Sequence, residues 1–302
     1  MSSVTERQSL VSVAIITYNQ KEYLRECIES VLAQDYPNIE IVVADDCSTD
    51  STQDMLREYE KQYPGRFILK LAEKNQGITK NSNEAQFACT GKYIAWMGGD
   101  DLMLPGKISK QVDFMEARED CDICYHNLEV FDSDTGKKIR LFNTPKNKFE
   151  GDVRVSIRQS TFNGACSNMV RASKVPEHGF RETLPVASDW MYWIEILHYG
   201  GGKIYYIDEV LGRYRKHANN VTRPETYITQ NELDHLNTCN LIMSLDAAYF
   251  PDALYIYAKR LQGLRHKLNY PSALLRSFVL KPGLKPLAGL FIYGLTLGKV
   301  RL

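Results

Sequence analysis

The chain has 302 residues, 44% of them hydrophobic and 25% charged, which is typical of a globular protein with one large domain or two smaller ones. Lys plus Arg and Asp plus Glu both number 37, so the net charge is zero and a dominant nucleic-acid-binding role is excluded. Residues 1–10 are polar and have no signal-peptide core, and the seven cysteines are scattered, so we expect a cytoplasmic protein.

Apolar strands alternate with helices in the first hundred residues. The pattern predicts strands at 11–16, 39–44, 67–71 and 93–97, and helices around 23–32, 55–59 and 79–89. Asn19 is a plausible cap of the first helix. Strands that alternate with helices of this length indicate βαβ units and a mostly parallel, right-handed sheet.

The alternation weakens after Pro105. The sequence predicts a helix at 107–117, a strand at 122–131, a loop or flap at 140–160, a helix at 189–199, a strand at 203–207 and helical structure over 225–268. We therefore divide the chain into a domain of residues 1–222, with halves at about 10–104 and 105–222, and a helical C-terminal region of residues 223–302.

Two of the predicted strands end in paired aspartates. The strand at 39–44 runs into Asp45-Asp46, and the strand at 93–97 reaches Asp100-Asp101 through two glycines. Crowded carboxylates raise one another's pKa unless a cation or a ligand relieves the repulsion. If the two strands are parallel neighbours, all four carboxylates lie at the sheet edge where α/β proteins bind ligands. This favours a metal and a phosphorylated ligand over helix capping as their role.

Other nucleotide and metal sites are disfavoured. A dinucleotide-binding turn should follow the first strand, where the chain has Thr17-Tyr18-Asn19, and no phosphate-binding loop of the G-x-x-x-x-G-K-[ST] type occurs. Cys121 and Cys124 form one C-x-x-C, but a zinc site usually needs a second pair. Packing on a strand is the better interpretation of these cysteines.

Several stretches resemble the family 2 glycosyltransferases of the GT-A fold. The stretches are residues 11–19, 30–37, 42–52, 75–77 with Asn83, and 91–101, with weaker matches at 188–193 and 214–222. The resemblance covers about residues 10–222 and is specific because many separate motifs occur in order. It implies an α/β fold with a Rossmann-like, mostly parallel central sheet flanked by helices, followed here by a mainly helical C-terminal extension.

The resemblance also implies an activity and its residues. It suggests an inverting, metal-dependent transfer of a sugar from a nucleoside diphosphate sugar, UDP- or dTDP-linked, to a saccharide hydroxyl, in bacterial surface polysaccharide synthesis (O-antigen or capsule). Asp189 matches the general base. Mg²⁺ or Mn²⁺ would be held by Asp100, with Asp101 or His217. The expected donor-binding residues are Thr17, Tyr18, Asn19, Asp45, Asp46, Asn75, Gly77, Lys80, Gly99, Asp100 and Arg215.

Some residues leave an alternative open. Gly98 stands where the metal-binding D-x-D motif often has its first aspartate, and Ser188 where the family often has glutamate beside the base. These departures favour a rival function, a non-catalytic sugar-nucleotide-binding or scaffold protein with the same fold. For Lys80 and His217 a solvated or structural role is the alternative, and Trp190 and Trp193 are better explained as core.

The tail at 287–298 is almost wholly apolar and is flanked by Lys281, Lys285, Lys299 and Arg301. Twelve residues cannot span a bilayer as a helix, which needs roughly 20. The sequence leaves two alternatives: an interfacial helix at a membrane surface, within residues 281–302, or packing against protein. Membrane docking would suit a lipid-linked saccharide acceptor.

Overall fold

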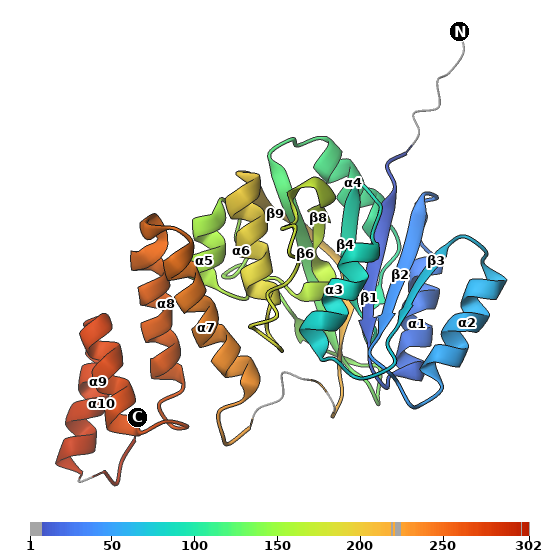
Figure 1. Cartoon of the computed structure of the whole chain (residues 1–302). Helices are drawn as coiled ribbons and strands as arrows, with labels where there is room; N and C mark the ends of the chain where they lie inside the picture. The colour runs from blue at the N-terminus through green and yellow to red at the C-terminus, as the bar shows by residue number, and fades with distance from the viewer. Residues whose placement is uncertain (1–7, 219, 221–224, 297, 302) are drawn as a thin grey trace.

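The computed structural model describes residues 8–218, 220, 225–296 and 298–301. In this part of the chain one mixed sheet has the strand order β3-β2-β1-β4-β8-β6-β9-β5, with β7 paired to β6 (Figure 1). The strands are β1 (Val11–Thr17), β2 (Ile39–Asp45), β3 (Phe67–Leu71), β4 (Tyr93–Gly98), β5 (Leu102–Met103), β6 (Cys121–Asp132), β7 (Lys138–Leu141), β8 (Met169–Arg171) and β9 (Lys203–Lys216). The predicted α/β fold class is therefore confirmed.

Ten α-helices are described. They are α1 (Lys21–Leu32), α2 (Thr52–Gln62), α3 (Ile78–Ala88), α4 (Lys107–Glu116), α5 (Val153–Gln159), α6 (Asp189–Gly200), α7 (Gln230–Leu245), α8 (Phe250–Gly263), α9 (Tyr270–Leu280) and α10 (Leu284–Leu295). In Figure 1, α7 to α10 lie beyond α5 and α6, at the opposite end of the molecule from β3.

Helices cover both faces of the sheet. Alternate residues of a strand point to opposite faces, so Val13 and Ile15 of β1 join a core with α1, α2 and α4, whereas Ala14 joins a second core with α3, α5 and α6. Cys239 of α7 and Ile256 of α8 belong to the second core. The first two helices of the C-terminal region therefore share a hydrophobic core with the sheet.

The first four strands follow the predicted parallel pattern, but their order corrects one expectation. β1 pairs in parallel with both β2 and β4, so the two aspartate-bearing strands are separated by β1 rather than adjacent. Their carboxyl ends still lie at one edge. Beyond β4 the sheet is mixed, because β8 runs antiparallel to both β4 and β6.

Four local predictions were wrong or incomplete. Residues 140–160 are not a single loop, since β7 ends there and α5 lies within it; both elements are short, and β7 is mostly exposed. The strand predicted at 203–207 continues to Lys216 because it pairs with β6 along its whole length. α9 was not predicted. Asn19 has a left-handed φ of 51° and is not the cap of α1, which starts after Gln20.

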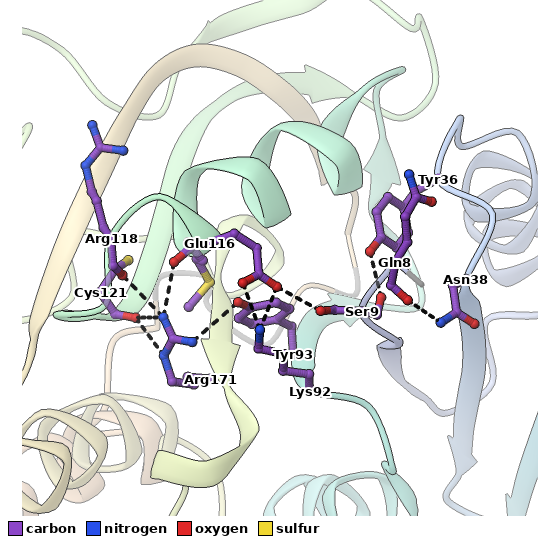
Figure 2. Close-up of polar contacts among 11 residues, drawn as sticks. Gln8, Ser9, Tyr36, Asn38, Lys92, Tyr93, Glu116, Arg118, Cys121 and Arg171 are labelled. Atoms are coloured by element: carbon purple, nitrogen blue, oxygen red, sulfur yellow. Dashed lines mark hydrogen bonds and ion pairs between the residues drawn. The ribbon is translucent and has the colours of Figure 1, made fainter. Parts of the chain in front are cut away.

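A polar network lies at the edge of the sheet where β4 begins, opposite the edge that carries the aspartate pairs (Figure 2). Lys92, just before β4, donates to both carboxylate oxygens of Glu116 at 2.7 and 2.8 Å. Arg171 of β8 donates to the carbonyl oxygens of Met115 and Arg118, at the C-terminal end of α4. A cation suits the negative end of a helix, so this network joins α4 to the start of β4 and the end of β8. Most of the predicted site residues lie at the other edge, where β1, β2 and β4 end.

The apolar tail resolves into α10, which packs on α9. Gly289 lies so close to Leu274 that a Cβ would be 2.7 Å from Leu274 Cδ1, and Tyr270 stacks on Tyr293. The opposite face, Leu284, Leu287, Phe291 and Leu295, is 48–84% exposed. Within the ranges described, no helix is both long and apolar enough to cross a membrane. The predicted domain boundary after residue 222 lies outside the described residues.

Candidate functional site

The end of β2 carries the first aspartate pair, and both carboxylates are hydrogen-bonded to nearby loops. Asp45 is fully buried; its Oδ2 accepts from Ser48 N at 2.9 Å and from Gln53 Nε2 at 2.8 Å. Asp46 Oδ1 accepts from Gln76 N at 2.7 Å, and its Oδ2 accepts from Gly77 N at 2.8 Å. These bonds attach both carboxylates to the residues around them, a role that is neither the ligand contact nor the helix capping considered from the sequence. Direct contact of either one with a ligand stays a prediction.

The loops after β1 and β2 also hold one another. Asn19 Oδ1 accepts from Thr49 N at 2.7 Å, and Asn19 N donates to Ser48 Oγ at 2.7 Å. Asn75 Nδ2 donates to the Asp46 carbonyl oxygen at 3.3 Å. Among the predicted donor-binding residues, Thr17, Asn19, Asp45, Asp46, Asn75 and Gly77 therefore come together at this edge. Tyr18 lies beside them and is 46% exposed.

Thr17 and Gly99 meet where β1 and β4 end. Gly99 N donates to the Ile16 carbonyl oxygen at 2.9 Å, and a Cβ on Gly99 would lie 3.0 Å from Thr17 Oγ1. Thr17 Oγ1 is buried and has no hydrogen-bond partner among the described residues. Glycine at 99 therefore permits this close approach.

The second aspartate pair divides into two environments. Asp100 Oδ2 lies 3.0 Å from His217 Nε2, and the His217 backbone N–H donates to Asn220 Oδ1 at 2.8 Å. Asp101 is 4% exposed, and its Oδ1 accepts from Arg215 N at 3.0 Å. Burial, and then the charge of Asp100, raises the pKa of the Asp101 carboxyl well above its usual range.

The expected metal site, Asp100 with Asp101 or His217, stays a prediction. Within the part of the chain that the structure describes, no group of three His, Cys, Asp or Glu side chains is arranged to hold a metal ion. Asp100 and His217 do come together, but Asp101 is buried and hydrogen-bonded to the backbone of β9. Gly98 contributes by having no side chain, since a Cβ there would lie 2.8 Å from Asp100 Oδ1.

Arg215 contacts the backbone of Asp100 from the protein interior. Its Nε donates to the Asp100 carbonyl oxygen at 2.8 Å, its Nη2 donates to Glu26 at 2.5 Å, and its guanidinium lies 4.6 Å from the centre of the Tyr23 ring. Arg215 is only 3% exposed, and its bond to the Asp100 carbonyl oxygen holds the backbone at Asp100 in place. Its predicted contact with the donor would come in addition to these bonds.

Asp189 is the first residue of α6, as predicted, and is partly buried. Its Oδ1 accepts from Trp190 N at 2.8 Å. Burial raises the pKa of the Asp189 carboxyl, and the Trp190 N–H opposes that rise. Trp190 and Trp193 are 1% and 2% exposed, which agrees with their interpretation as core.

Helix α3 connects the strand ends to the segment before Asp189. Asn81 Nδ2 donates to the carbonyl oxygens of Ala44 and Thr17, at 2.9 and 3.3 Å. Two residues earlier, Thr79 Oγ1 lies 2.9 Å from Ser188 Oγ and donates to the Leu184 carbonyl oxygen at 2.5 Å. One helix therefore contacts both the strand ends and the segment just before Asp189.

Other residues of α3 contact residues 176–180, which precede the same segment. Asn83 exchanges two hydrogen bonds with the backbone of Phe180, at 3.0 and 2.7 Å, and Gln86 donates to the Pro176 carbonyl oxygen. Lys80, on the exposed side, pairs with Glu182 at 3.6 Å. The sequence analysis did not identify Thr79, Asn81 or Gln86 as site residues. The sequence feature that could have identified them is a series of polar residues at helical spacing. The helix has too few apolar residues to form the usual buried stripe.

Comparisons with known proteins agree with the fold. The model of the family described as "Glycosyl transferase family 2" matches residues 12–178, more than half of the chain. An uncharacterized Mycobacterium tuberculosis protein is 30% identical over 214 residues, covering 70% of this chain and 60% of the relative's length. The Bacillus subtilis protein TuaG, named a putative teichuronic acid biosynthesis glycosyltransferase, is 26% identical, covering 78% of this chain and 92% of TuaG.

Two solved structures share the fold. Residues 1–349 of Staphylococcus aureus TarS, in complex with UDP-GlcNAc, superpose with a TM-score of 0.70 at 18% identity, covering 96% of this chain and 88% of that one. The mannosyltransferase PcManGT from Pyrobaculum calidifontis, in complex with GDP-Man and Mn²⁺, superposes with a TM-score of 0.57 at 16% identity, covering 98% of this chain and 82% of that one.

Proposed function

The chain belongs to glycosyltransferase family 2, and from this premise we propose that it moves one sugar from a nucleoside diphosphate sugar to a saccharide hydroxyl, with inversion at the sugar carbon. UDP- and dTDP-sugars are the proposed donors, and bacterial surface polysaccharide synthesis is the proposed setting. The names of TuaG and of the UDP-GlcNAc complex of TarS support this choice. The observation that carries the proposal is the contact of α3 with both the strand ends and the segment before Asp189.

Asp189 is the proposed general base. The acceptor hydroxyl would give its proton to this carboxylate, its oxygen would form a bond to the anomeric carbon, and the bond from that carbon to the diphosphate would break. Attack from the side opposite the leaving group inverts the carbon. The raised pKa makes the Asp189 carboxylate a stronger proton acceptor than an exposed aspartate. The helix N-terminus favours its ionised form, which a base needs before it reacts.

The residues around Asp100 fit a divalent cation in their chemistry. A carboxylate oxygen and an imidazole nitrogen, 3.0 Å apart on different elements, are ligands that Mn²⁺ accepts, and the oxygen also suits Mg²⁺. A cation held by Asp100 and His217 would neutralise charge on the diphosphate leaving group. Arg215 and Asn220 would then act by holding these two side chains in place. The Mn²⁺ in the PcManGT complex supports this assignment.

The exposed face of α9 and α10 supports a membrane-surface contact for a lipid-linked acceptor. Leu275 and Val279 of α9 are 54% and 69% exposed, and the exposed α10 residues continue this apolar face. Exposed Lys281, at the end of α9, and Lys285, in the first turn of α10, would face anionic lipid headgroups. We expect Phe291→Asp, at a position that is 66% exposed, to weaken sedimentation with anionic liposomes while donor hydrolysis is unchanged. Equal sedimentation of the two proteins would contradict the contact.

The function is tested by Asp189→Asn, which preserves size and much of the capping ability. Transfer should fall about 10²–10⁴-fold, the usual contribution of general acid–base catalysis. UDP affinity and melting temperature should change little, because the hydrogen bond that Asp189 Oδ1 accepts comes from its neighbour, Trp190 N. Glu182→Gln is the matched control, since this exposed carboxylate lies on the same segment. Normal transfer by Asp189→Asn would remove the base assignment.

The rival function, a non-catalytic binding or scaffold protein, is separated by a second assay. An enzyme releases nucleoside diphosphate from its donor slowly in the absence of acceptor, and a scaffold does not. Release of UDP from a panel of UDP-sugars, measured with Mn²⁺ and with EDTA, therefore distinguishes the two. The donor panel also identifies the sugar.

A further inference from the structure

The segment just before Asp189 is held from two sides. On one side α3 contacts it through Thr79, as described above. On the other side lies Asp234 of α7, a helix of the C-terminal region and outside residues 12–178, which the family model matches. Asp234 is completely buried although aspartate is among the residues least often buried.

The Asp234 carboxylate accepts three hydrogen bonds from described residues. Its Oδ2 accepts from the backbone N–H of Val186 at 2.7 Å and of Ala187 at 2.9 Å. Its Oδ1 accepts from Gln230 Nε2, one helical turn earlier, at 2.7 Å. A buried carboxylate is costly unless hydrogen bonds satisfy it. The two backbone N–H groups therefore tie this charge to the segment that leads into α6.

These bonds lie two and three residues from Asp189. Ser188, the one residue between, is itself buried and fixed by Thr79. The start of α6 is thus set by α3 on one side and by the Asp234 carboxylate on the other. Bonds to an ionised acceptor are shorter and stronger than neutral ones, so Asp234 is well suited to fix the position of this backbone.

We propose that Asp234 is a positioning residue for the reaction: it holds residues 186–187 so that Asp189 stands at the acceptor hydroxyl. The inference rests on the proposed function, because it gives Asp189 the role of base. It makes α7 part of the catalytic machinery rather than an appended helix. A displacement of about 1 Å at a reacting group can lower a rate on the order of 10²-fold, so loosening this contact should slow transfer.

The test uses an exchange of hydrogen-bonding groups. In Asp234→Asn the acceptor of the two backbone N–H groups loses its charge, and the new amide nitrogen finds an acceptor only if the Gln230 amide turns over to present its oxygen. Adding Gln230→Glu supplies an acceptor, so that the amide donates to the new carboxylate and its oxygen accepts from Val186 and Ala187. Asp246→Asn is the matched control, because Asp246 caps a short helix by accepting from Ala248 N and, among the described residues, has no hydrogen bond to residues 186–189.

We expect the transfer kcat of full-length Asp234→Asn to fall about 10–100-fold, with the donor KM unchanged. The double variant should regain most of this rate, and Asp246→Asn should match the wild type. Hydrogen exchange of the Val186 and Ala187 amides, which does not depend on activity, should be faster in the single variant and slow again in the double variant. If Asp234→Asn does not fold, Asp234→Glu, which keeps the charge and adds one methylene, should show the same fall in kcat.

The outcomes distinguish failure of the positioning role of Asp234 from failure of the proposed function. Unchanged transfer in Asp234→Asn together with loss in Asp189→Asn overturns the positioning role and leaves the proposed function standing. Unchanged transfer in both variants overturns the base, and the positioning role with it. A fall in kcat that the double variant does not restore also overturns the positioning role, because it shows only general damage to the fold.

Discussion

The two aspartate pairs look alike in sequence and differ in the structure. Asp45-Asp46 follows β2, and its carboxylates accept hydrogen bonds from the loops around them, through Ser48 and Gln53 and through the backbone of residues 76–77. Asp100-Asp101 follows β4, and its two carboxylates separate: one meets His217, and the other is buried against β9.

The difference shows that a position at a strand end does not by itself determine the role of a carboxylate; the groups around it do. The first pair is surrounded by backbone N–H donors from turns, which satisfy it without a cation. The second pair has an imidazole on one side and a buried cluster of ionisable groups on the other. Cys27 and Cys166 lie in that cluster; burial raises the pKa of both thiols, and the charge of Asp101 raises each further. We therefore expect the first pair to serve folding and the second to serve chemistry.

The largest effect should come from Asp100→Ala. Loss of the carboxylate that faces His217 should abolish the gain in UDP affinity on adding Mn²⁺ and lower transfer at least about 10²-fold, because charge on the leaving group is no longer neutralised. Calorimetry with Mn²⁺ and with EDTA measures the first effect. Asp54→Asn, at an exposed aspartate of α2, is the control for losing one negative charge, and equal UDP affinity in both conditions for the wild type would remove the metal from the proposal.

Asp46→Ala should lower the free energy of unfolding, because Asp46 holds the loop of residues 76–77. It leaves the N–H groups of Gln76 and Gly77 without their carboxylate acceptor, and bonds to a charged group are worth about 1.5–3 kcal/mol each. Water can replace part of this in a surface loop, so we expect a loss of about 2–3 kcal/mol in the free energy of unfolding. Urea denaturation measures it. An unchanged midpoint with lost UDP binding would instead assign Asp46 to the ligand.

The smallest effect should come from Lys107→Met, below the second pair. Lys107 is fully buried, its Nζ has no hydrogen-bond partner among the described residues, and burial lowers its pKa from 10.5 to about 8. Removing this unpaired cation should raise the free energy of unfolding at pH 7 by about 1–2 kcal/mol.

The same shift predicts a pH dependence. Between about pH 8 and 10.5 the unfolded wild type holds a proton on Lys107 that the folded protein has lost, so Lys107 contributes a rise in stability with pH across that window, opposed by the fall that the buried thiols contribute. Lys107→Met should lack that rise. Urea titrations at pH 7 and pH 9.5 compare the two, with exposed Lys110→Met as the control. A wild-type rise no larger than that of Lys107→Met would contradict the assignment.

The sequence predicted the regular elements of the first hundred residues well. Apolar runs at strand spacing and stripes at helical spacing are local signals, and β3 coincides with its predicted span at 67–71. Prediction failed where elements are short or depend on partners. α5 has seven residues, and β9 continues past its polar Asp208-Glu209 because β6 pairs with it. No local signal marks such tertiary pairing.

The sequence by itself determined which chemistry-bearing residues stand at strand ends, because a βαβ order brings the carboxyl ends of β1, β2 and β4 to one edge. Only the tertiary structure decided which of them are satisfied by the protein and which face outward. That choice depends on donors brought from distant positions: Gly77 to Asp46, Arg215 to Asp101, and residues 186–187 to Asp234. A hydrogen bond acts over about 3 Å, so separations of 31, 114 and 47 residues along the chain carry no trace of it in the sequence.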